Sequence, residues 1–180
     1  AYNSKACIVF DHVDDWLGQS AGAICSALSG DDLPCTILYA GRFRTTGAFN
    51  NIVAAWDNSA TASRWVTDYD SGTAMASFRH DGAAGVAGPF VTDADTNRRA
   101  WAMRFTGTTA EFFKDGISSG APQACNTGSV SFDLFSLGAQ RVLGTPSDFA
   151  DLELAELLVY DRSLTDAELR ATSTYLRRFG

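Results

Sequence analysis

Three carboxylates lie close together near the C-terminal end of the chain. Asp151, Glu153 and Glu156 belong to an otherwise apolar run, Asp151–Tyr160 (DLELAELLVY), which has the length and composition of a β-strand. Paired carboxylates that face one cleft about 5 Å apart can hydrolyse a glycosidic bond. Because side chains alternate along a strand, we expect Asp151 and Glu153 on one face and Glu156 on the other. This pattern favours solvated carboxylates and argues against catalysis.

Nucleophilic catalysis and zinc binding have little support elsewhere in the sequence. The two histidines, His12 and His80, are expected in turns or on the surface, and no G-x-S-x-G motif is present. No CxxC pair stands near a histidine, so a zinc site is not expected. The cysteines could form disulfides, or they could be small apolar core residues. Both interpretations stay open for Cys7, Cys25, Cys35 and Cys125.

An acidic segment in the middle of the chain begins like a calcium-binding loop. Asp93, Asp95 and Asn97 follow the spacing of the first EF-hand ligands. Arg98 stands where that loop needs Gly, and Arg104 stands where it needs Glu, which excludes an EF-hand. A looser surface calcium site built from the first three residues is open beside the alternative of a solvated loop. Calcium is the one cofactor that the sequence suggests.

Aromatic residues with polar neighbours could provide the platforms that glycan-binding sites use. Two clusters fit this description, one composed of Trp56, Asp57 and Asn58 and the other of Trp65, Tyr69 and Asp70. The alternative for each tryptophan is a place in the core, where large aromatic residues are usually buried. Trp16 and Trp101 are assigned to the core.

The composition describes one globular domain that spans residues 1–180. Hydrophobic residues make up 46% of the chain and charged residues 19%, which is typical of a folded protein. The formal net charge is −7, so nucleic acid and anionic membranes are not expected as partners. No apolar stretch approaches the roughly 20 residues that span a bilayer. Ala1–Lys5 contains no apolar signal-peptide core, which leaves open whether a signal has been removed.

Short segments with strand character follow one another along most of the chain. The clearest are Ala6–Phe10, Cys35–Phe43, Asn51–Trp56, Arg64–Thr67, Thr73–Arg79, Trp101–Phe105, Thr108–Phe113, Ser129–Leu137 and Asp151–Tyr160. Asp115-Gly116 predicts a hairpin turn, and His80-Asp81-Gly82 predicts a second one. Strands with one apolar face must bury it against another layer. The pattern therefore predicts an all-β, two-sheet antiparallel jelly-roll sandwich.

A single helix is predicted at the C-terminal end. Thr165 and Glu168 are spaced as a capping box, and Leu164 and Leu169 as a hydrophobic staple. Leu169, Thr172, Ser173 and Leu176 form one stripe at helical spacing. Gly180 stands where a C-terminal cap is expected.

Four segments carry a further pattern in a fixed order along the chain. They are Phe10–Leu17 (FDHVDDWL), Arg99–Phe105 followed by Glu111–Gly116, Leu134–Ala139, and Ala155–Glu168 (AELLVYDRSLTDAE). They resemble, in turn, the F-D-G-x-D-D-Y-L opening, the paired strands with an Asp-Gly hairpin, the penultimate strand and the closing signature of laminin-G-like domains. These domains belong to the concanavalin A-like lectin and glucanase superfamily. His12 departs from the pattern, because Gly is usual there.

The resemblance implies a curved sandwich that serves recognition of glycans or proteins, sometimes with calcium. Related jelly-roll glucanases carry Glu-x-Asp-x-Glu or Glu-x-Asp-x-x-Glu, whereas this chain has Asp-x-Glu-x-x-Glu. We therefore expect a non-catalytic module. Such domains occur in secreted bacterial proteins and in phage particles.

Three functions follow from these considerations. The first is a virion component at the particle surface, such as a capsid decoration, head spike or fibre, which docks on a capsid or tail protein, binds host-surface polysaccharide and forms a homo-oligomer. The second is a lectin-type module of a secreted, extracellular bacterial protein. The third, which the carboxylate order disfavours, is a glycoside hydrolase.

Overall fold

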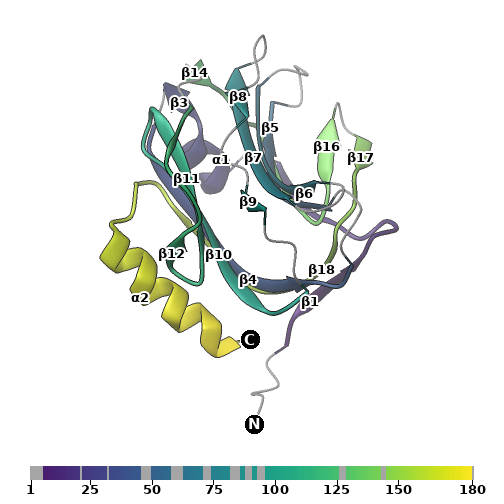
Figure 1. Cartoon of the computed structure of the whole chain (residues 1–180). Coiled ribbons are helices and arrows are strands. Elements are labelled where there is room, and N and C mark those ends of the chain that lie inside the picture. The colour runs from purple at the N-terminus through teal and green to yellow at the C-terminus, as the bar shows by residue number, and fades with distance from the viewer. Residues whose placement is uncertain are drawn as a thin grey trace.

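The computed structural model describes residues 6–20, 22–31, 33–45, 50–57, 63–70, 74–81, 86–87, 91–92, 96–125, 129–142 and 145–179. In these residues two antiparallel sheets of seven strands each pack face to face, and a helix covers the outer side of the first sheet (Figure 1). The predicted jelly-roll sandwich with a short C-terminal helix is confirmed. No helix in the described ranges is long and apolar enough to cross a membrane.

The first sheet contains the first and the last of the described strands. Its strands in spatial order are β1 (Ile8–Asp11), β18 (Asp151–Tyr160), β4 (Cys35–Phe43), β10 (Arg99–Phe105), β11 (Thr109–Lys114) and β12 (Ile117–Ser118), with β13 (Gln123–Ala124) also paired to β11. Its two central strands, β4 and β10, are antiparallel, with Leu38 opposite Ala102.

The second sheet has β5 and β6 at its centre. Its strands in spatial order are β2 (Leu17–Ser20), β15 (Leu134–Leu137), β5 (Asn50–Trp56), β6 (Ser63–Asp70), β7 (Ala74–Asp81) and β8 (Val86–Ala87), with β9 (Val91–Thr92) also paired to β7. Two small ribbons pair β3 (Gly30–Asp31) with β14 (Ser129–Val130), and β16 (Gln140–Val142) with β17 (Thr145–Ser147).

The main core fills the space between the sheets. Alternate residues of the first sheet point inward and are buried, among them Ile37, Tyr39, Trp101, Met103 and Leu152. Residues of the second sheet and of the short helix α1 (Ala23–Leu28) close the cluster from the other side, including Ile52, Phe135, Cys25 and Leu28. Trp101 is therefore a core residue, as expected. Trp16 is only half-buried, because it lies in the loop between two edge strands and packs over Gly18.

Helix α2 (Asp166–Leu176) buries part of the outer face of the first sheet. Leu164, Leu169 and Leu176 pack with Leu38, Ala40, Ala100, Ala102 and Phe113 in a second apolar cluster. The predicted capping box is confirmed: the Thr165 hydroxyl accepts the Glu168 N–H, and the Glu168 carboxylate accepts the Thr165 N–H. Arg104 ties the helix start to the sheet, since its guanidinium donates to Asp166, to Glu111 and to the Leu164 carbonyl.

The helix end differs from the prediction. Helix α2 stops at Leu176 with Arg177 as its C-cap, and a 3-10 turn, η1 (Arg177–Phe179), follows. Gly180 lies outside the described residues, so the helix ends several residues before the glycine that was expected to cap it.

A β-bulge in β18 changes the face on which its second half points. The pairing register with β4 shifts between Leu154 and Glu156, so that Ala155 is the extra residue. Leu152 and Leu154 point into the main core before the bulge, and Leu157 and Val159 do so after it. Glu156 therefore shares the outer face with Glu153. The predicted placement on opposite faces is wrong because a simple two-residue alternation cannot represent the bulge.

Most predicted strands are confirmed, with ends that differ from the predicted ends by at most three residues. The predicted Asp-Gly hairpin is also confirmed, as the turn between β11 and β12. Asp115 and Gly116 have φ of 54° and 81°, and Lys114 pairs with Ile117 across the turn. His12 has φ of 69°, which is the left-handed conformation that explains the usual Gly at this place in the resembling family.

Three further sequence predictions need correction, and the question left open for the cysteines can be answered. Helix α1 was not predicted, and its six residues are too few to show a clear period. The predicted strand Ser129–Leu137 is two strands, β14 and β15, which belong to different sheets. The turn at His80-Asp81-Gly82 is not seen at its first two residues, which belong to β7, while Gly82 lies outside the described residues. None of the four cysteines, all of which are described, forms a disulfide.

Candidate functional site

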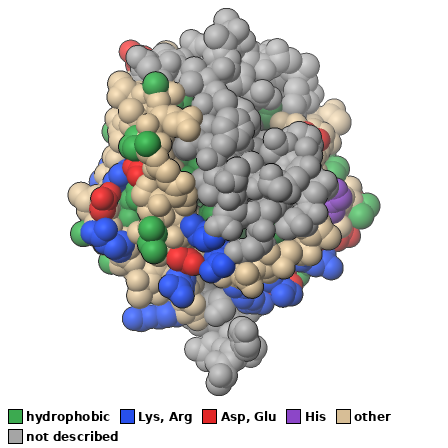
Figure 2. Space-filling view, in the orientation of Figure 1, with side chains coloured by type: hydrophobic (Ala, Val, Ile, Leu, Met, Phe, Trp, Pro, Cys, Tyr) green, Lys and Arg blue, Asp and Glu red, His purple; other side chains and the backbone are tan. Residues whose placement is uncertain are grey.

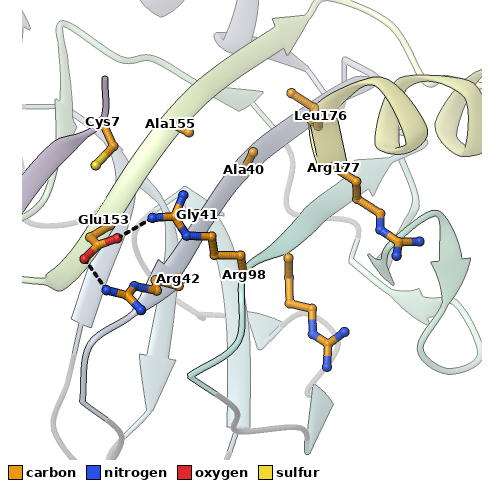
Figure 3. A pocket seen from close by; sticks show the side chains of 10 residues that line it. Cys7, Ala40, Gly41, Arg42, Arg98, Glu153, Ala155, Leu176 and Arg177 are labelled. Atoms are coloured by element: carbon orange, nitrogen blue, oxygen red, sulfur yellow. Dashed lines mark hydrogen bonds and ion pairs between the residues drawn. The ribbon is translucent and has the colours of Figure 1, made fainter. Parts of the chain in front are cut away.

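A pocket of about 140 Å³ opens on the outer face of the first sheet, beyond the C-terminal end of α2 (Figure 3). Its described lining comes from β4, β10, β18, the residues just before β1 and β10, and the helix end. The lining residues are Cys7, Ala40, Gly41, Arg42, Arg98, Arg99, Glu153, Ala155, Leu176 and Arg177. Four of these ten residues are arginines.

The floor of the pocket is low because small residues occupy it. Ala40 and Gly41 lie on β4, and Ala155 is the bulged residue of β18. A Cβ atom at Gly41 would collide with the backbone carbonyl oxygen of Glu153, so glycine is required for the two strands to approach here. The bulge and this glycine together shape the depression.

One wall of the pocket is an arginine–glutamate cluster. Arg42 donates to one oxygen of Glu153 at 2.6 Å, and Arg98 donates to the other at 3.0 Å (Figure 3). The Glu153 side chain is 14% exposed, whereas those of Arg42 and Arg98 are 43% and 33% exposed. The carboxylate therefore lies at depth and the guanidinium groups at the rim. The hydrogen bond from Arg42, supported by the charges of the neighbouring arginines, lowers the pKa of Glu153 although its burial raises it.

On the opposite side, the lining residues Arg99 and Arg177 pair with Asp115 of the β11–β12 turn, which does not itself belong to the described lining. Asp115 accepts the Ala100 N–H at 3.0 Å and a guanidinium N–H of Arg99 at 3.2 Å. Arg177, at the end of α2, lies 3.8 Å from the same carboxylate, which is beyond hydrogen-bond distance. The Arg177 side chain is 62% exposed, so it is held more loosely than Arg99.

This arrangement suits binding better than acid–base chemistry. A general acid needs a carboxyl group that holds a proton near neutral pH, and the lowered pKa of Glu153 keeps it ionised. Glycoside hydrolysis also requires a second carboxylate in the same cleft. Asp151 accepts a hydrogen bond from Thr45 and pairs with Arg44, and it does not belong to the described lining. Asp151 therefore provides no second carboxylate in the described lining beside Glu153.

The described residues among the predicted glycan-binding ones lie on or directly next to the second sheet, and none belongs to the described pocket lining. Trp56 is 1% exposed and packs with Ala54 and Leu134, so its ring offers no open platform, and the core alternative holds for it. Asp57 is half-buried directly after β5. Asn58 lies outside the described residues. Trp65, Tyr69 and Asp70 belong to β6, opposite Ala55, Asn50 and, on the other side of β6, Ala74.

The calcium prediction is only partly covered by the described residues. Asp93 and Asp95 lie outside them, and Asn97 is exposed just before β10. Within the described residues one acidic group has suitable spacing: carboxylate oxygens of Asp11, Asp14 and Asp15 lie within 4.8 Å of one another, and all three residues are exposed. Calcium takes six to eight oxygen ligands, so three exposed carboxylates provide at most part of a site.

The arginines of the pocket were not singled out from the sequence. Arg42 falls at a polar position of an alternating strand and Arg98 just before one, where a solvated charge is the ordinary expectation. Arg177 stands at a helix end, where a cation needs no further explanation. The one available signal was that Arg42 continues the outward-facing phase of Leu38 and Ala40, and Arg98 that of Ala100 and Ala102.

Comparisons with known proteins define the fold and not the family. No protein-family model matches the chain, and no curated protein matches it. Among solved structures, the IT-sialidase CBM40 of Ruminococcus gnavus bound to α2,3-sialyllactose has a TM-score of 0.69 at 13% identity, covering 93% of this chain and 98% of that one. A heptameric SAP-like pentraxin from Limulus polyphemus has a TM-score of 0.66 at 12% identity, covering 92% of this chain and 80% of that one.

A structure of botulinum neurotoxin type C, a toxin whose cell entry depends on interaction with two ganglioside molecules, is also similar. It has a TM-score of 0.72 at 9% identity and covers 93% of this chain but 42% of the toxin chain. These similarities agree with the jelly-roll sandwich fold of this chain.

Proposed function

We propose that this chain is a non-catalytic carbohydrate-recognition module that binds one sugar residue in the pocket beyond α2. The observation that carries the proposal is the pocket itself, a small-floored depression whose walls present guanidinium and carboxylate groups. Sugar hydroxyls are recognised by such convergent polar groups, which donate and accept hydrogen bonds in fixed directions.

The size of the pocket restricts what it can hold. Sites for drug-sized ligands enclose about 300 to 1,000 Å³. A pocket of about 140 Å³ accommodates a single sugar residue or its substituent and not a length of polysaccharide. We therefore infer recognition of a terminal or branching residue.

The similar structures support this proposal by analogy. Two of these proteins interact with a glycan or glycolipid: the Ruminococcus gnavus module binds sialyllactose, and the botulinum toxin interacts with gangliosides. A shared fold does not transfer a ligand, so the site must supply the argument for this chain.

We propose further, from the resemblance to laminin-G-like domains, that the module is displayed on a virion surface. It would dock there on a capsid or tail protein and present its pocket to a host-surface polysaccharide. A secreted, extracellular bacterial protein is the alternative setting. Detection of the chain in purified phage particles supports the first setting, and its recovery as a lone monomer from culture medium contradicts it.

A glycan array that contains neutral and acidic structures tests the recognition function. We expect the chain to bind at least one glycan, and Ala155→Leu, which fills the pocket floor, to abolish that binding while the protein stays folded. Ala121→Leu is the matched control, because Ala121 is exposed and does not line the pocket. Absence of binding to any glycan contradicts the proposal, and so does unchanged binding by a folded Ala155→Leu variant. Release of reducing ends from the bound glycan would contradict the non-catalytic part.

A further inference from the structure

The pocket is positively charged on a protein that is negatively charged overall. Of its ten described lining residues, four are arginines and one, Glu153, is acidic. The formal charge of the whole chain is −7. In Figure 2, Lys and Arg side chains gather over the lower part of the view, on the side where α2 ends in Figure 1. This concentration attracts an anion locally although the chain as a whole repels one.

The lining also lacks the usual feature of neutral-sugar sites. Aromatic rings commonly form the apolar part of such sites, and none of the ten described lining residues is aromatic. Leu176 and the alanines provide only a small apolar surface. The affinity of the pocket must therefore come mainly from charge-assisted hydrogen bonds, which are roughly twice as strong as neutral ones.

We propose that the sugar residue bound in this pocket is acidic and that its carboxylate is held by Arg177 together with Arg99. The inference rests on the proposed carbohydrate-recognition function and names the ligand class. A planar guanidinium matches a carboxylate in a two-point contact. Arg177 meets the requirement best, because its 3.8 Å separation from Asp115 and its exposure allow it to turn toward a ligand.

The wall formed by Arg42, Arg98 and Glu153 can bind the neutral part of the same sugar. Glu153 holds Arg42 and Arg98 by separate oxygens, which fixes both guanidinium groups over the floor. The side chains of Arg42 and Arg98 are 43% and 33% exposed, so a ligand in the pocket can reach both guanidinium groups. These two arginines can therefore contact ring hydroxyls of the same sugar while the anion lies at the opposite wall.

Arg177 also has a structural role that the test must separate. It stands at the C-terminal end of α2, where a cation offsets the negative end of the helix dipole. Arg178 is its neighbour, carries the same charge at the same helix end, is exposed, and does not line the pocket. Arg178→Gln is therefore the matched control for Arg177→Gln.

The experiment measures binding of acidic sugars and of their carboxyl-reduced forms by calorimetry. The probes are N-acetylneuraminic acid, glucuronic acid and galacturonic acid, each as the terminal residue of an oligosaccharide, with the reduced partner as the neutral control. For the acid that binds, we expect carboxyl reduction to weaken binding about tenfold or more, and Arg177→Gln to weaken it to a similar extent. Arg178→Gln should change the affinity less than twofold.

Glu153→Gln should change the preference for the acid in the opposite direction. It removes a negative charge from the pocket and loosens Arg42 and Arg98 for both ligands alike, so the affinity for the acidic sugar relative to its reduced partner should rise about fivefold in the folded variant. Equal binding of acidic and reduced sugars overturns the acidic-ligand inference alone and leaves the recognition function intact. Equal effects of Arg177→Gln and Arg178→Gln, or a lower preference for the acid in a folded Glu153→Gln variant, also overturn it. Failure of every sugar to bind contradicts the recognition function itself.

Discussion

Two halves of the outer face of the first sheet have the same three strands and opposite chemistry. Under α2 the outward-facing residues are apolar: Leu38 on β4, Ala102 on β10 and Leu158 on β18. One step further they are Ala40 on β4 and Ala100 on β10, while β18 has Glu156 and the bulged Ala155 there. Beyond the helix end they are charged: Arg42, Arg98 just before β10, and Glu153. The change occurs at the same level on all three strands.

This comparison explains why a pocket forms where it does. An apolar face must be covered, and α2 covers it as far as Leu176. The charged half needs no cover, since its guanidinium groups can be solvated at the rim. The small residues between the two halves are too short to fill the step between helix and sheet, and the pocket occupies that step.

Shortening a buried side chain of α2 should destabilise the packing of the helix on the first sheet. Leu169 is fully buried between α2 and the sheet, so Leu169→Ala should lower the free energy of unfolding by about 2 to 5 kcal/mol. Tyr175→Ala, on the exposed side of the same helix, is the control and should cost far less. Urea denaturation measures both, and similar losses for the two variants would contradict the packing described for α2.

A methyl group at Gly41 should disturb the close approach of β4 and β18 between the apolar and the charged half of the outer face. Gly41→Ala should lower the free energy of unfolding by about 1 to 3 kcal/mol, because its Cβ would meet the Glu153 carbonyl where β18 bulges. Gly120→Ala is the control, since no atom lies within 4 Å of a Cβ built there. The same denaturation experiment compares them. Equal stability of the two variants would show that β4 and β18 are not held this closely.

The N-terminal cap of α2 should contribute a smaller part of the free energy of unfolding. Thr165→Ala removes the hydroxyl that accepts the Glu168 N–H and should cost about 1 kcal/mol. Thr174→Ala is the control in the exposed middle of the helix and should cost less than about 0.5 kcal/mol. Thermal unfolding of both variants measures the difference, and a Thr174→Ala variant that is the less stable of the two contradicts the capping-box assignment.

The same cap should make stability depend on pH. Hydrogen bonds from Arg162 and then from the Thr165 backbone and hydroxyl lower the pKa of Glu168 from 4.5 to about 2. A carboxylate with a lowered pKa stabilises the folded state above its ordinary pKa, and this stabilisation is lost as the pH falls from 4.5 toward 2. The melting-temperature difference between the native chain and Glu168→Gln should therefore be larger at pH 6 than at pH 2.5. A difference that is constant over this range rules out the ion pair as its source.

Much of the fold could be predicted from the sequence because local rules were sufficient there. The Thr165–Glu168 cap, the Asp115-Gly116 turn and the alternation of Cys35–Phe43 each depend on residues close together in the chain. The resemblance to laminin-G-like domains added the order of the segments. The predicted fold was correct for these reasons.

The pocket could not be predicted because it depends on contacts between distant segments. The bulge at Ala155 reverses the alternation of β18, and only the paired strand reveals it. Arg42, Arg98 and Glu153 come together through strand register, 111 and 55 positions apart along the sequence for the two hydrogen bonds. Trp56 had the composition of a glycan platform, but packing against Leu134 buries it.

Backbone amide chemical-shift mapping during titration with the glycan that binds most tightly tests the central claim most directly. We predict that the largest shifts occur at Ala40, Gly41, Ala155 and Leu176, around the pocket beyond α2, while the glycan stays intact. Shifts confined to the Asp11–Leu17 loop or to Ala54–Asp57 at the second sheet would contradict glycan binding in this pocket.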